Sequence, residues 1–383
     1  MLKRRNYSVK QLISVALFFI GCTFVGNSQS KKNQIDTRVR SSFNSNWKFI
    51  QNDITGAEQI EFNDASWRTL NLPHDWSIEG AYDEKNPMGD QCGYLPAGFG
   101  WYRKTITVPA TWKGKHVEIA FDGVFMNSTV WANGKKLGTR PYGWVSFAYD
   151  ISEIAQTSKE ITFAVRVDND KQPSARWYTG SGIYAHTWID VKNNNHIAND
   201  GIFIKTVKNN IFVETDLSTI DKKVKKAVLI TSVIDKDGKI VATAENKIVS
   251  NTVIKTNLTI NNPTLWSTKT PYLYTLKSEL KIKKQVVDVV ETKFGVRDVE
   301  WIAETGMWLN GENVKLQGVC NHQDAGALGA AVPDKILRFR IQQLKNMGVN
   351  AIRTSHNPQT PIFYDICDEL GMLVMDEIFD GWK

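Results

Sequence analysis

Polar and ionisable side chains follow three short apolar stretches in the last quarter of this 383-residue chain. Imidazole, guanidinium and carboxylate groups that meet at one site can bind hydroxyl groups, move protons and orient a nucleophile. A lone histidine at such a position is as often structural, but two of them after different stretches favour a shared pocket. The candidate residues are His322, Asp324, Arg353, His356, Asn357, Asp376 and Glu377.

The spacing of apolar residues predicts the elements that must position these side chains. Helical spacing over residues 334–347 and 361–370 predicts two helices, and short apolar runs predict strands at 314–319, 349–352 and 372–375. Alternating strands and helices with short loops predict parallel strands, whose carboxyl ends are where α/β folds place their chemistry. The buried stripe of the first helix is predicted to be Leu337, Ile341, Leu344 and Met347.

The first 30 residues are predicted to be a signal peptide. Four basic residues precede an apolar run over residues 12–25, which is too short to span a bilayer, and small polar residues 27–30 form a cleavage region. Lipoprotein cleavage before Cys22 is the alternative, but bulky residues precede that cysteine. We therefore expect an exported protein, periplasmic or extracellular, without a lipid anchor.

Charge and cysteine content exclude several classes of protein. The formal net charge of +7 falls to near +3 when the four basic residues of the leader are set aside. No basic run interleaved with aromatic residues remains, so nucleic-acid binding is not predicted, and no second apolar run predicts a membrane span. Cys92, Cys320 and Cys367 lack metal-ligand spacing and are predicted to be buried thiols, not a disulfide framework.

Two β-rich segments precede the strand and helix series. Alternating apolar residues and turn signals, such as Asn133-Gly134, predict a sandwich over residues 40–192. Most tryptophans there are expected to fill its core. Trp177 is the exception, because the loop of residues 176–182 looks built to pack against another part of the protein. Residues 196–296 have the size of a seven-stranded immunoglobulin-like sandwich.

Short motifs occur in all three segments and are specific in combination. They lie at residues 62–67, 72–76, 98–103, 121–124, 176–184, 265–267, 271–274, 294–297, 309–311, 318–322 and 350–358. Together they resemble the N-terminal part of glycoside hydrolase family 2, the family of β-galactosidases and β-glucuronidases. The resemblance covers everything after the leader, although Asn357 stands where a tyrosine is common in the family.

The resemblance implies a multi-domain, mainly β fold. It places a sugar-binding jelly-roll β-sandwich at residues 40–192, an immunoglobulin-like β-sandwich at 196–296, and the first strands and helices of a (β/α)8 TIM barrel at 298–383. The acid/base glutamate and the nucleophile glutamate are then expected beyond Lys383. No catalytic residue is therefore assigned, and the chain alone is expected to be inactive.

The same resemblance gives roles to several candidate residues. His322 and His356 are expected to hydrogen-bond the sugar near the reacting carbon, and Arg353 is expected to lie beside the nucleophile and favour its ionised form. Arg176 and Trp177 are expected at the rim of the pocket.

The carboxylates near the end of the chain have other interpretations. Asp376 and Glu377 cannot flank one glycosidic bond, because successive residues of a strand point to opposite faces. They are expected to line or support the pocket, and an interior salt bridge from one of them is the alternative role for Arg353. Asp324 either binds a hydroxyl group or caps its loop.

The implied function is that of an exo-acting retaining β-glycosidase that removes terminal β-linked sugars. β-Galactosidase is favoured, with β-glucuronidase or a related activity as the alternative, and a non-catalytic carbohydrate-binding or adhesion module is a second alternative. The expected partner is an oligosaccharide or glycoside, with an oligomer left open. No cofactor or metal ligand set is evident, although the resemblance allows Mg²⁺ near the acid/base residue of the complete enzyme.

Overall fold

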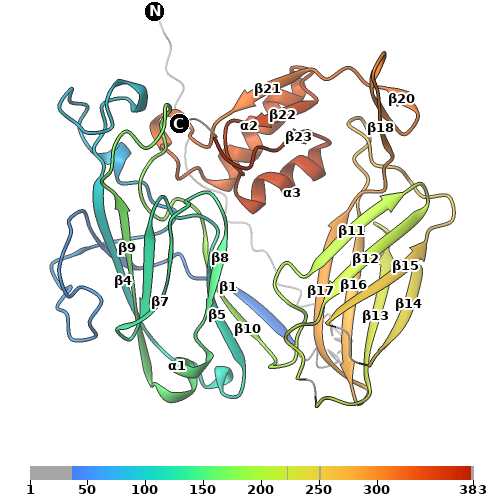
Figure 1. Cartoon of the computed structure of the whole chain (residues 1–383), viewed down its shortest axis with the longest axis horizontal. Coiled ribbons are helices and arrows are strands. Elements are labelled where there is room, and N and C mark those ends of the chain that lie inside the picture. The colour runs from blue at the N-terminus through green and yellow to red at the C-terminus, as the bar shows by residue number, and fades with distance from the viewer. Residues whose placement is uncertain (1–36, 222, 250–251, 381–383) are drawn as a thin grey trace, which may run out of the picture. The chain divides into compact units, whose positions relative to one another are not determined.

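The computed structural model describes residues 37–221, 223–249 and 252–380, which form mostly β-strands with few helices (Figure 1). The predicted signal peptide, including Cys22, lies outside the described residues. None of the helices in the described ranges is long and apolar enough to cross a membrane.

Residues 38–192 form two sheets around one apolar core (Figure 1). Val117, Ile119 and Phe121 alternate along one strand, and all three are fully buried, which explains why this segment is a strand. The four-stranded sheet has the order β1 (Arg38–Ser42), β10 (Thr187–Lys192), β5 (His116–Phe121) and β8 (Phe147–Asp150), and a short helix, α1 (Ser152–Thr157), follows β8. The six-stranded sheet has the order β3 (Arg68–Leu70), β2 (Trp47–Ile50), β4 (Gly98–Thr107), β9 (Glu160–Asn169), β6 (Ser128–Ala132) and β7 (Lys135–Arg140).

The local predictions for this segment are confirmed where the structure describes them. Asn133 and Gly134 join β6 to β7 with φ angles of 49° and 74°, the two positive values that a tight hairpin turn requires. Most of the tryptophans are buried, whereas Trp177 lies in a loop and is only partly buried.

In the second β segment, the described residues form seven strands in two sheets. Its core contains the fully buried Leu229, Leu276 and Ile211. One sheet has the order β11 (Ile202–Val207), β12 (Asn210–Asp216) and β15 (Val253–Thr259). The other has the order β14 (Ile240–Ile248), β13 (Ala227–Ile234), β16 (Tyr274–Ile282) and β17 (Gln285–Phe294).

A small antiparallel sheet and then a parallel sheet complete the described chain. The first consists of β18 (Val299–Ile302), β19 (Gly306–Leu309) and β20 (Glu312–Asn313). The second has the order β21 (Gly318–Asn321), β22 (Ala351–Thr354) and β23 (Leu373–Met375). Helices α2 (Asp334–Asn346) and α3 (Pro361–Leu370) connect these parallel strands (Figure 1).

Two predicted strands begin later than expected because of Asn350. Its side-chain oxygen accepts a hydrogen bond from the Gln317 N–H at 2.8 Å, and its amide nitrogen donates to the Lys315 carbonyl at 2.9 Å. These bonds fix the backbone just before the ladder, whose first pair is Gly318 and Ala351. Met347 also departs from the prediction: helix α2 ends at Asn346, and Met347 is 78% exposed.

Trp266 ties the second β segment to helix α3. Its indole nitrogen donates to the backbone carbonyl of Asp368 at 2.8 Å, and its own carbonyl accepts from the Asn310 side chain at 3.0 Å. The ring packs in a small apolar cluster with Leu309 and Leu373. This indole is therefore one of the contacts that hold α3, together with the ion pair between Lys293 and Glu369 of the helix.

Candidate functional site

A buried carboxylate, Asp75, holds the backbone of three segments together. Gly180 and Gly329, both at positive φ, let the chain approach it so closely that a Cβ at either position would lie within 2.5 Å of Asp75 Oδ2. Burial raises the pKa of Asp75, while its four hydrogen-bond donors oppose that rise. The donors are the backbone N–H groups of Ser77, Ser181 and Ala330, at 2.9–3.1 Å, and the Tyr178 hydroxyl at 2.6 Å.

His74, the neighbour of this carboxylate, is buried as a neutral imidazole. Its Nδ1 lies 2.7 Å from the Tyr102 hydroxyl, and its Nε2 accepts from the Arg68 guanidinium at 2.9 Å. Burial lowers the pKa of His74 to about 4, although Glu79 opposes the shift. The resulting stability is fully present above pH 6.5 and is lost as the pH falls toward 4, because the unfolded chain takes up the proton first.

We expect the wild-type protein to lose roughly 3 kcal/mol more unfolding free energy than His74→Gln between pH 7 and pH 4. Urea unfolding of both proteins at a series of pH values measures this difference. Equal losses in the two proteins would show that another group carries the acid sensitivity.

Two candidate histidines meet at the ring of Trp177. The ring of His356, which follows β22, lies 5.0 Å from the Trp177 ring, and the ring of His322, which follows β21, lies 5.7 Å from it. The two imidazoles are 5.5 Å apart. Burial and the neighbouring His356 lower the pKa of His322, which favours a neutral ring that can both donate and accept. The structure thus gathers these three residues, and their contact with a sugar stays a prediction.

Arg353 forms an ion pair with Glu377, one of its two predicted roles, but the pair is partly exposed and not interior as predicted. Its Nε and Nη2 lie 2.7 and 2.6 Å from Oε1 of Glu377, and Oε2 of Glu377 lies 2.9 Å from Nδ1 of His356. Burial acts to raise the pKa of Glu377, but Arg353 and His356 outweigh it and the pKa lies below its ordinary value. The guanidinium therefore fixes an ionised carboxylate, which in turn orients His356.

Asp376 has different partners from its neighbour Glu377. It accepts hydrogen bonds from the Thr354 hydroxyl at 2.9 Å and the Tyr364 hydroxyl at 2.7 Å. The two carboxylates therefore do not act as a matched pair. Asp324 caps its own loop, as one of its two interpretations predicted: its Oδ2 accepts from the Gly326 N–H at 3.4 Å.

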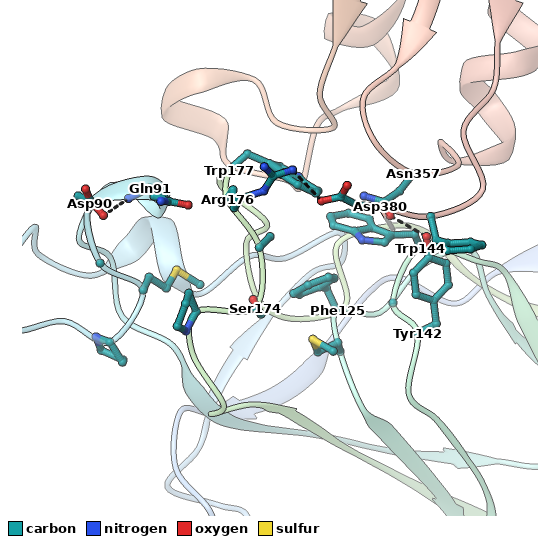
Figure 2. Close-up of a pocket in the computed structure, with 18 residues that line it drawn as sticks. Asp90, Gln91, Phe125, Tyr142, Trp144, Ser174, Arg176, Trp177, Asn357 and Asp380 are labelled. Atoms are coloured by element: carbon teal, nitrogen blue, oxygen red, sulfur yellow. Dashed lines mark hydrogen bonds and ion pairs between the residues drawn. The ribbon is translucent and has the colours of Figure 1, made fainter. Parts of the chain in front are cut away.

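A cavity of about 510 Å³ opens beside these groups, and aromatic rings form much of its wall (Figure 2). Arg176 closes one side of it through an ion pair to Asp380 at 3.3 Å. Of the predicted site residues, Arg176, Trp177 and Asn357 line the cavity. The other side chains labelled around it in Figure 2 are Asp90, Gln91, Phe125, Tyr142, Trp144, Ser174 and Asp380.

The amide of Asn357 has three partners: the Tyr142 hydroxyl, the Trp144 indole, and the His356 carbonyl, to which its nitrogen donates at 3.1 Å. The Tyr142 hydroxyl has one proton, which it donates to the Ile378 carbonyl at 2.7 Å, so it accepts from the Asn357 amide nitrogen at 2.6 Å. In this orientation the Asn357 oxygen accepts from the Trp144 indole at 3.3 Å. Asn357, which stands where the resembled family commonly has a tyrosine, is thus hydrogen-bonded into the wall of the cavity.

Several buried polar atoms near the ends of β21 and β22 have no hydrogen-bond partner among the described residues. Buried polar atoms normally have hydrogen-bond partners, so a cluster of atoms without partners needs an explanation. A polar ligand that binds here is one explanation. The atoms belong to the side chains of Trp177, Asn321, His322 and Gln323.

The prediction that all three cysteines are buried is wrong for Cys320, which is exposed, whereas Cys92 and Cys367 are buried. Cys320 lies in β21, which pairs with β22 on one side, and its sulfur lies 3.7 Å from Nη1 of Arg353. Asp75, Tyr142 and Trp144 were not predicted. Asp75 lies within the motif of residues 72–76, which was the only sequence feature that pointed to it. Burial of a carboxylate has no sequence pattern of its own, and no motif pointed to Tyr142 or Trp144.

Comparison with known proteins assigns the family. The family models described as "Glycosyl hydrolases family 2" and "Glycosyl hydrolases family 2, TIM barrel domain" match residues 195–297 and 301–379. A protein of Formosa agariphila with the provisional name beta-glucuronidase is 44% identical over 370 residues, which are 96% of this chain and 35% of that protein. "Beta-galactosidase BoGH2A" of Bacteroides ovatus is 40% identical, over 92% of this chain and 43% of its own length.

A solved structure agrees with these sequence comparisons. The structure of "a beta-glycosidase from Bacteroides vulgatus" superposes with a TM-score of 0.85 at 41% identity, over 90% of this chain and 45% of that one. The chain therefore belongs to glycoside hydrolase family 2. It spans less than half the length of the curated relatives it matches here.

Proposed function

We propose that the complete enzyme is an exo-acting retaining β-glycosidase and that these residues build one wall of its sugar pocket. The observation that carries the proposal is the group of unpartnered buried polar atoms around Trp177 and His322. A sugar offers hydroxyl groups to such atoms and an apolar face to an aromatic ring. The parallel strands β21, β22 and β23 are proposed to be the first three of the catalytic barrel.

The catalytic glutamates are proposed to lie elsewhere in the complete enzyme. Glu377 is held by Arg353 and His356, and Asp376 bonds Thr354 and Tyr364, so neither is placed to share one glycosidic bond with the other. Within the described ranges, no three His, Cys, Asp or Glu side chains gather as metal ligands at this cavity.

The preferred substrate is proposed to be a neutral β-linked hexose such as galactose. Both arginines at the site are already paired with carboxylates, Arg176 with Asp380 and Arg353 with Glu377. A glucuronide brings its own carboxylate, which is bound best by an arginine that has no other anionic partner. Export of the enzyme, proposed from the first 30 residues, would fit a polysaccharide-derived substrate.

We expect the complete enzyme to hydrolyse nitrophenyl β-galactoside with a kcat/KM at least about tenfold above that for nitrophenyl β-glucuronide. Steady-state kinetics on the two substrates, which share the leaving group, measures the ratio. Preference for the glucuronide would favour the alternative activity. Binding of both sugars with no turnover of either would favour a non-catalytic carbohydrate-binding protein.

A further inference from the structure

Two histidines and a glutamate come together at a place the proposed sugar pocket does not use. His116 and Glu118 lie two residues apart on β5 and so share one face, whereas His196 lies in the segment between β10 and β11. One potential ligand atom of each side chain lies within 4.8 Å of those of the other two, a grouping found among the residues that the structure describes. Their separation in sequence explains why spacing alone gave no metal signal.

Each of the two histidines is oriented by a hydrogen bond at its outer nitrogen. Nδ1 of His196 donates to the Asn193 carbonyl at 2.8 Å, so the lone pair is on Nε2, and this ring is only 2% exposed. Nδ1 of His116 lies 3.3 Å from the Ser152 hydroxyl, while its Nε2 faces Glu118 Oε1 at 2.6 Å. Histidines that bind metals are held in this way by a second hydrogen bond.

Glu118 is held from the side away from the histidines. Its Oε2 accepts from the buried ammonium of Lys192 at 2.8 Å and from the Asn199 side-chain amide. Its Oε1 is the oxygen that faces His116. Oε1 of the carboxylate thus faces the two histidines and can bind an ion, while Oε2 neutralises the charge of Lys192.

We propose that His116, Glu118 and His196 bind a divalent metal ion of the Zn²⁺ kind. Two imidazoles and one carboxylate are a donor set that suits zinc, whereas Ca²⁺ and Mg²⁺ prefer oxygen ligands alone. Nε2 of His116 would release to solvent the proton that it now shares with Glu118 and bind the metal instead. A water molecule would complete a tetrahedral site.

Such an ion would join β5 to the segment that leads into the second β segment. That segment is already fixed to β17, because the Asn193 amide donates to the Val287 carbonyl at 2.5 Å and the Ile197 N–H donates to Asp288 at 2.8 Å. The ion would therefore have a structural role at this junction. It is independent of the proposed glycosidase function.

The test measures Zn²⁺ and Co²⁺ binding to the untagged, chelator-treated full-length chain by calorimetry and visible absorption. We expect one equivalent to bind, with the strong visible bands of tetrahedral Co²⁺. His196→Gln and Glu118→Gln should each weaken binding at least about tenfold. His186→Gln, which changes a histidine that bonds Asp334 outside the cluster, should leave binding unchanged. Equal binding by all four proteins, or no binding by the wild type, would overturn the proposal.

A second measurement keeps the proposal testable if the variants do not fold. Wild-type crystals soaked in ZnCl₂ should give an anomalous peak at about 2.0–2.2 Å from Nε2 of His116, Nε2 of His196 and Oε1 of Glu118. Peaks only at other sites would contradict the assignment.

Discussion

In the complete enzyme, Arg353→Ala is expected to lower kcat by about 100-fold or more, with a much smaller change in KM. Arg353 holds Oε1 of Glu377 through two guanidinium nitrogens, and the other oxygen of Glu377 holds His356. Loss of the guanidinium would therefore release two side chains at once and leave a carboxylate without its cation. If Arg353 also lies beside the nucleophile, as proposed, the pKa of that nucleophile would rise as well.

Three further variants test the same proposal by their kinetics. His356→Ala and His322→Ala should lower kcat more than they raise KM, because hydrogen bonds to the sugar tighten as the ring flattens in the transition state. Arg176→Ala should act mainly on KM, since its ion pair to Asp380 lies at the wall of the cavity. If the histidine variants changed KM alone and Arg176→Ala abolished kcat, the proposed assignment would be reversed.

Asp75→Ala is expected to destabilise the protein by about 4 kcal/mol or more. It would leave the N–H groups of Ser77, Ser181 and Ala330 without an acceptor, and each such buried group costs roughly 1–3 kcal/mol. The Tyr178 hydroxyl would lose its partner too. Urea unfolding of wild type and variant measures the change.

Asp75→Asn is the matched control for this variant. The asparagine oxygen can keep the bonds from Ser77 and Ser181, while its NH₂ group faces the Ala330 N–H and cannot accept from it. We expect a loss smaller than that of the alanine variant. A variant pair with equal, small losses would show that Asp75 is not the junction of these segments.

The sequence predicted the elements around the site better than the contacts within it. Helix α3 begins at Pro361 and ends before Gly371 at φ 72°, as its residue types required. The predicted starts of β21 and β22 were two to four residues too early, at the place where the side chain of Asn350 bonds the preceding loop. The spacing of apolar residues contains no information about such bonds between side chains and the backbone. The prediction that Cys320 is buried failed because the apolar character of a strand does not show which neighbours cover it, and in the described chain β21 pairs with β22 alone.

Residues from distant segments were the hardest part of the site to predict. Trp177 was singled out because its loop looked built for packing, and it does pack against His322 and His356. Tyr142 and Asn357 lie 215 residues apart, and each is ordinary in its own segment. Only the fold shows that the side-chain amide of Asn357 hydrogen-bonds a tyrosine and a tryptophan, Tyr142 and Trp144, from a distant part of the chain.

The bond from Trp266 to helix α3 has a consequence for which substitutions this junction tolerates. The indole donates to the backbone carbonyl of residue 368, and the side chain of Asp368 is exposed. A main-chain acceptor is present whatever amino acid occupies that position. Substitution of residue 368 should therefore keep the bond, whereas substitution of Trp266 by any residue without an indole N–H should abolish it.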